Sequence, residues 1–172
     1  MRSLTEHLAQ YAAYHRDRRN IATHFVGIPM IVLAVCIFLS RPSFAAFGAV
    51  LSPASLVAGL LAIFDRALDL RFGVAMCAVL AVCLLAARWF ATQTTAIWIV
   101  SGAGFFVVGW VFQLVGHHHE GRKPAFLDDV IGLIIGPLFV VAEIAFALGW
   151  RKEISRAVEA HAGPTHIGRA EG

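Results

Sequence analysis

The sequence predicts an all-α membrane protein, a polytopic helical bundle with four membrane spans and a fifth apolar helix that is broken or re-entrant. Of its 172 residues, 59% are hydrophobic and only 15% are charged, whereas a globular domain is about half apolar and a quarter charged. Several apolar runs also reach the roughly 18–20 residues that are needed to cross a bilayer. We expect a single membrane domain, 1–150, and a polar C-terminal tail, 151–172.

The expected elements follow from the alternation of polar and apolar stretches. The polar stretch 3–17 is expected to form an N-terminal helix. The expected spans are about 24–39, 44–64, 72–90, 96–115 and 126–150. Pro53 falls in the middle of the second span, so a kink is expected there. The fifth segment contains Gly136-Pro137 and the acidic Glu143, and these features indicate a broken, tilted or re-entrant helix.

The loops carry unequal numbers of cationic side chains, which predicts the orientation. With four crossings, one side of the membrane has Arg41 and Arg88 before the tail is counted. The other side has Arg2, Arg16, Arg18, Arg19, Arg66, Arg71, Arg122 and Lys123. The positive-inside rule places this second side, and the N-terminus with it, in the cytoplasm. The expected location is the bacterial inner membrane, with the N-terminus cytoplasmic.

The net charge of +3 is attributed to this topology. Nucleic acid is not expected as a partner, because no basic face is interleaved with exposed aromatic residues. Membrane lipids are expected partners, and the oligomeric state does not follow from the sequence.

The chain has eight histidines, and five of them gather at two places that this topology puts on the same side of the membrane. His15 and His24 flank the entrance to the first span, and the stretch 117–119 precedes Glu120 at the exit of the fourth. Imidazoles near a carboxylate are typical ligands of divalent transition metals, and two His with one carboxylate suit an oxygen-activating ferrous ion. The spacing predicts a metal site but not its reaction.

Helix geometry narrows the choice of ligands. An unbroken helix would place His15 and His24 on opposite faces, so both can join one site only if the chain turns near residues 17–20. His117 and Glu120 are three residues apart and share a face. A simpler interpretation stays open for each histidine, because imidazoles at a membrane interface are often solvated or act as amphipathic anchors.

The same helix geometry predicts how neighbouring side chains lie relative to His117. Gln113 lies one turn before His117, whereas His118 and His119 point away from it if the helix continues. For Glu143, a structural role is favoured over a place in the site.

Two stretches carry a resemblance to a known family. The first is Tyr-His-x8-His-x2-Gly-x-Pro, from Tyr14 to Pro29, and the second is Gln-x2-Gly-His-x2-Glu-Gly-Arg-Lys-Pro-Ala, from Gln113 to Ala125. Over roughly residues 5–150 the chain resembles the Mpo-type family. These are small membrane proteins similar to the yeast endoplasmic-reticulum 2-hydroxy fatty acid dioxygenase.

The resemblance implies an iron(II)-dependent dioxygenase of fatty acid α-oxidation. The expected reaction converts a 2-hydroxy fatty acid into the fatty acid that is one carbon shorter and releases carbon dioxide, with dioxygen as the second substrate. A 2-hydroxy carboxylate can chelate ferrous iron through two oxygens and leave a position open. Together with the spacing, the resemblance predicts Fe²⁺ ligands, which are also the expected catalytic residues: His15, His24, His117 and Glu120, with His119 as the first replacement.

Binding of the lipid substrate is expected close to these ligands. Arg122 and Lys123 follow Glu120 almost directly and are expected to attract the carboxylate of the substrate, together with Gln113.

Two other classes stay open. A di-metal lipid hydroxylase or desaturase would need HxxxH and HxxHH boxes, which this chain lacks. A non-enzymatic metal-binding membrane protein, such as a carrier, would place polar ligands near the bilayer midplane. In this chain, only Glu143 is expected to lie deep in the membrane.

Overall fold

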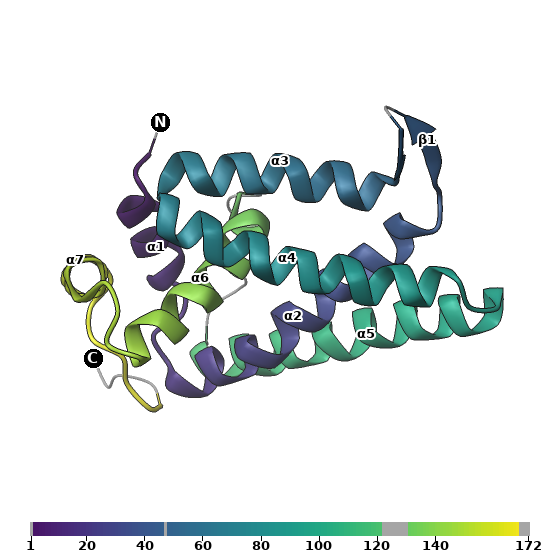
Figure 1. The fold of residues 1–172 in the computed structure, drawn as a ribbon. Coiled ribbons are helices and arrows are strands. Elements are labelled where there is room, and N and C mark those ends of the chain that lie inside the picture. Colours follow the sequence, from purple (N-terminus) through teal and green to yellow (C-terminus); the bar gives the residue numbers. More distant parts are fainter. Residues whose placement is uncertain (1, 47, 122–130, 169–172) are drawn as a thin grey trace. The chain divides into compact units, whose positions relative to one another are not determined.

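The computed structural model describes residues 2–46, 48–121 and 131–168, and these residues are mostly helical (Figure 1). The element order is α1 (Leu4–Ala12), α2 (Arg18–Ser40), β1 (Phe44–Ala46), β2 (Ala49–Leu51), α3 (Pro53–Leu68), α4 (Leu70–Ala91), α5 (Thr95–Glu120), α6 (Gly132–Ala147) and α7 (Lys152–Ala162). The predicted all-α class is confirmed, with one small hairpin added. The chain forms two compact units, 1–28 with 110–172, and 29–109.

Within the described residues, three helices are long and apolar enough to cross a membrane: α2, α4 and α5. Helices α6 and α7 form a fourth candidate, because together they pass the same criterion but bend by 116° at the break between them. Such a bend fits a broken span or a re-entrant segment, but it lies after Ala147, whereas Gly136-Pro137, on which the expected break rested, lies inside the continuous helix α6. The predicted number of four spans plus this helix stays a prediction.

The expected second span, 44–64, is where the fold departs most from expectation. Its first part is an antiparallel hairpin in which Phe44 pairs with Leu51, and its helix α3 begins only at Pro53. The expected kink at Pro53 is wrong, because proline suits the first turn of a helix, where its missing N–H has no helical partner. The Ser52 side chain accepts a hydrogen bond from the Ser55 N–H and caps this start.

The N-terminal helix is also shorter than expected. Ser3 and Glu6 form a capping box at its start, but α1 ends at Ala12 rather than at residue 17. The start of the expected fifth span falls on residues 122–130, outside the described residues. The polar tail contains a helix, α7, that sequence inspection missed.

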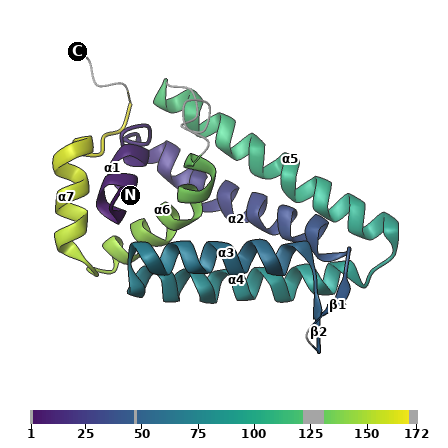
Figure 2. The same ribbon diagram turned by 90° about the horizontal axis from the view of Figure 1, so that it is seen from above.

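In the unit 29–109, α3 and α4 run antiparallel and lie side by side (Figures 1 and 2). A separate apolar cluster joins α2, α4 and α5 around the buried Cys36, Ile37 and Ala87. Trp98 of α5 donates its indole N–H to the Ile37 carbonyl at 2.9 Å. This bond satisfies the polar end of an otherwise apolar ring.

In the other unit, α1 packs against both α6 and α7. The buried side chains there include Leu8 and Ala12 of α1 and Leu138 and Phe139 of α6. This packing holds the end of α1, and residues 13–17 then lead directly into α2. We call residues 13–17 the ligand turn, because they include His15.

Candidate metal centre

Three of the predicted ligands, His15, His24 and His117, come together in the unit 1–28 with 110–172. Each residue offers one ring nitrogen, and these three nitrogens all lie within 4.8 Å of one another. The ring centroids are 4.4–5.1 Å apart. His15 comes from the ligand turn, His24 from the second turn of α2 and His117 from the last turn of α5. All three side chains are buried. Their arrangement suits an ion held by imidazole nitrogens.

Backbone hydrogen bonds orient two of these rings. His15 Nδ1 donates to the Tyr11 carbonyl at 2.7 Å, and His24 Nδ1 donates to the Asn20 carbonyl at 2.9 Å. A carbonyl only accepts, so in the neutral rings both Nε2 atoms carry lone pairs. These Nε2 atoms nevertheless lie 3.0 Å apart. Two facing lone pairs repel, and a cation bound by both removes this repulsion, so the donor set fits a metal.

Aromatic packing shields the centre from water. The Tyr11 ring stacks on His15 with centroids 4.2 Å apart and an interplanar angle of 7°, and Phe139 of α6 packs against both rings. Burial, followed by the neighbouring His24, lowers the pKa of His15 well below its usual value. The neutral imidazole that binds a metal is therefore the favoured form.

A close approach between α2 and α5 brings His117 to the other two histidines. A Cβ at Gly116 would collide with Thr23 Oγ1 and Asn20 Oδ1 of α2. Only a residue without a side chain allows the two helices to pass this closely. Gly116 immediately precedes His117, so it places that ligand.

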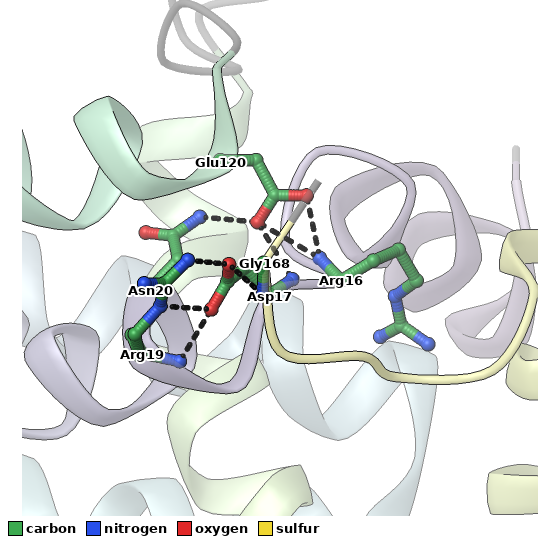
Figure 3. A network of polar contacts seen from close by, with 6 residues as sticks. All are labelled: Arg16, Asp17, Arg19, Asn20, Glu120 and Gly168. Atoms are coloured by element: carbon green, nitrogen blue, oxygen red, sulfur yellow. Dashed lines mark hydrogen bonds and ion pairs between the residues drawn. The ribbon is translucent and has the colours of Figure 1, made fainter. Parts of the chain in front are cut away.

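Glu120, the fourth predicted ligand, lies at the N-terminus of α2. Its Oε1 accepts from the Arg16 N–H at 2.9 Å. Its Oε2 accepts from the N–H groups of Arg16 and Asp17, at 3.0 and 2.9 Å, and from Asn20 Nδ2 at 2.9 Å. Figure 3 shows these contacts. Glu120 is not among the side chains whose ligand atoms gather within 4.8 Å of one another, and its role as a ligand stays a prediction.

Comparison with known proteins identifies the family of this chain. The family model described as "2-hydroxy-palmitic acid dioxygenase Mpo1-like" matches residues 1–148. The chain belongs to the Mpo1-like family. It is also 27% identical over 179 aligned positions to the 2-hydroxy-palmitic acid dioxygenase MPO1 of Saccharomyces cerevisiae. That alignment covers 91% of this chain and 87% of the yeast protein. No solved structure matches the chain.

The remaining predicted residues lie in different places in this member of the Mpo1-like family. Gln113 is buried one turn before His117, and among the described residues its Nε2 has no hydrogen-bond partner. His118 is exposed and His119 is half-buried, and neither joins the three-histidine group. Arg122 and Lys123 lie outside the described residues.

The sequence predicted a chain turn near residues 17–20, but not the contacts that shape the ligand turn. Asp17 caps α2, because its Oδ1 accepts from the Arg19 N–H at 2.8 Å. The Arg19 guanidinium, bonded to the same carboxylate, lowers the pKa of Asp17. An aspartate just before an apolar helix is a recognisable N-cap signal. No comparable signal marked the bond of Asn20 to Glu120 or the role of Gly116, because both depend on contacts between distant segments.

Proposed function

We propose that this protein is an iron(II)-dependent dioxygenase that shortens 2-hydroxy fatty acids by one carbon. The balanced reaction converts R–CH(OH)–COOH and O₂ into R–COOH, CO₂ and H₂O. The observation that carries this proposal is the buried group of three histidines with two Nε2 atoms 3.0 Å apart. The name of the yeast relative supports the substrate class.

We propose that His15, His24 and His117 hold the ion, with their rings fixed by the Tyr11 and Asn20 carbonyls. Bound ferrous iron would supply the site for dioxygen and for the two oxygens of a 2-hydroxy carboxylate. We propose that the buried Gln113, whose Nε2 has no partner in the described part of the chain, donates to a polar group of the substrate. Glu120 as a fourth ligand is the alternative that the variants below test.

The acyl chain of such a substrate is apolar, and the long apolar helices α2 and α5 lead from this site. We propose that the enzyme lies in a membrane and takes its substrate from it, with the N-terminus on the cytoplasmic side as the positive-inside rule indicates. An acyl chain inside the bilayer keeps its apolar surface away from water.

The test uses purified full-length protein in detergent, loaded with Fe²⁺ without oxygen. It is then mixed with 2-hydroxypalmitic acid and air-saturated buffer. We expect pentadecanoic acid by mass spectrometry and dioxygen uptake in equal amount. Palmitic acid, which lacks the 2-hydroxyl group, is the matched control and should remain unchanged.

The metal content of the same sample separates the alternative classes. About one iron per chain with turnover supports the dioxygenase. Two irons per chain would indicate a di-metal hydroxylase or desaturase. Bound iron without any oxidation of the 2-hydroxy acid would indicate a non-enzymatic metal-binding protein.

A further inference from the structure

The main chain of the ligand turn and of the first turn of α2 is held by segments far away in the sequence. The N–H groups of Arg16 and Asp17 donate to Glu120 of α5, and the Arg18 N–H donates to the His166 carbonyl at 2.9 Å. A helix normally leaves its first N–H groups without helical partners. Here, residues about 100 and 150 positions away supply those partners.

The C-terminal segment 163–168 contacts the ligand turn at several points. The His166 N–H donates to the Arg16 carbonyl at 2.9 Å, and the Gly168 N–H donates to Asp17 Oδ2 at 3.0 Å. Arg16 Nη1 donates to the Gly163 carbonyl at 2.7 Å. Figure 3 shows Gly168 beside Asp17, with Glu120 also bonded to the turn.

The negative charge of Glu120 suits its contact with the start of α2. It is the last residue of α5, where the negative end of the helix dipole disfavours a carboxylate, but it faces the N-terminus of α2, where the dipole favours one. Both of its oxygens accept hydrogen bonds from the turn or from Asn20. A carboxylate occupied in this way has less capacity left for a metal ion.

We propose that Glu120 and the C-terminal segment 163–168 are positioning elements that hold His15 in the geometry required for metal binding. His15 is the one ligand that lies outside a helix, so its place depends on the ligand turn. The proposal rests on the three-histidine metal site proposed above. It gives Glu120 an indirect role and gives the segment 163–168, beyond the region matched by the family model, a role in the centre.

The variants E120A and E120Q separate positioning from ligation. Alanine removes all four hydrogen bonds of the carboxylate. A glutamine carbonyl at the place of Oε2 keeps three of them, those from Arg16 N–H, Asp17 N–H and Asn20 Nδ2. Glutamine lacks the negative charge of a ligating carboxylate, so a ligand role would make it as damaging as alanine.

A pair of truncations tests the C-terminal segment. A chain that ends at Ala162 loses every contact of residues 163–168, whereas a chain that ends at Gly168 keeps them. The second truncation is the matched control.

The measurement is a Co²⁺ titration of each full-length or truncated protein in detergent, followed by visible absorption. We expect E120A and the chain ending at Ala162 to bind Co²⁺ about 10-fold to 100-fold more weakly, as is typical for loss of groups that orient ligands. E120Q and the chain ending at Gly168 should stay within about 10-fold of the wild type. E120Q should also keep the wild-type absorption bands.

Trypsin cleavage of the metal-free proteins gives a second readout. The proposal predicts faster cleavage after Arg16, Arg18 and Arg19 in E120A and in the chain ending at Ala162, because the turn is released. This readout does not depend on enzyme activity.

The outcomes are distinguishable. A wild-type protein that binds no Co²⁺ contradicts the proposed function itself. Co²⁺ binding by the wild type with unchanged affinity in E120A and in the chain ending at Ala162 overturns the positioning role. Altered absorption bands or a loss in E120Q as large as in E120A overturn it as well and make Glu120 a ligand.

Discussion

His15 and His24 face each other through their Nε2 atoms at 3.0 Å, while both Nδ1 atoms are engaged by backbone carbonyls. This pair is the clearest chemical feature of the molecule. Two neutral imidazoles with these hydrogen bonds cannot donate to each other. A cation between them gives both lone pairs a partner, and His117 supplies a third nitrogen nearby.

Alanine at any one of the three histidines should weaken metal binding. We expect His117→Ala to lower iron affinity by at least about 10-fold, because the remaining nitrogens cannot complete the site. His118→Ala, at the exposed neighbouring position, is the matched control and should keep the iron, as should His119→Ala. Iron content by mass spectrometry checks this, and a loss of iron in His119→Ala would move the third ligand to that residue.

Substitution of Gly116 should destabilise the protein and weaken the metal site. The Cβ of Gly116→Ala would meet Thr23 and Asn20, and forced overpacking costs about 1–3 kcal/mol. Gly104→Ala on the same helix has nothing within 4 Å of its Cβ and should be neutral or stabilising, by up to about 1 kcal/mol. Thermal unfolding in detergent measures both, and equal stability of the two variants would contradict the close approach.

Substrate affinity should depend on the two cations that follow Glu120 in the sequence. We expect the double variant Arg122→Gln and Lys123→Gln to raise KM for a 2-hydroxy fatty acid while iron content stays near that of the wild type. The reason is the loss of positive charge that attracts the carboxylate of the substrate. Loss of iron with unchanged KM would assign these residues to folding or topology.

The number of crossings can be read from the sides on which Ser3 and Thr92 lie. Cysteines introduced at these positions, in a variant without Cys36, Cys77 and Cys83, should be labelled from opposite sides of the membrane. This outcome requires α3 to cross beside α4, against which it packs. Labelling from the same side would mean that the 16-residue α3 does not cross, and the predicted topology would be wrong.

The contribution of Asp17 to stability should depend on pH. Hydrogen bonds from the Arg19 side chain hold the pKa of Asp17 below its usual value, so the carboxylate stabilises the fold above about pH 4 and loses this effect as the pH falls. Asp17→Asn should therefore lower Tm at about pH 7, and the difference from the wild type should shrink below about pH 4. A difference that does not change with pH would contradict the ionic role.

The sequence by itself determined the all-α class and indicated membrane spans, because long apolar runs separated by short polar links leave few alternatives to long apolar helices. It also identified His15, His24 and His117 as candidate ligands, because few residue types bind divalent transition metals and histidine is one of them. The expected turn between the first two histidines is confirmed, but it begins a few residues before the predicted 17–20, because α1 ends at Ala12 and α2 begins at Arg18.

Only the tertiary structure decided how the ligand turn is held and where Glu120 points. Periodicity reports which residues share a face of one helix, and it predicted a shared face for His117 and Glu120, which both lie in α5. It contains no information on which N–H groups a distant carboxylate will meet. The partners of Glu120 are the N–H groups of Arg16 and Asp17, just before α2, and the side-chain amide of Asn20, all about 100 residues away. N–H groups that precede a helix have no helical partner, so a distant carboxylate can accept from them.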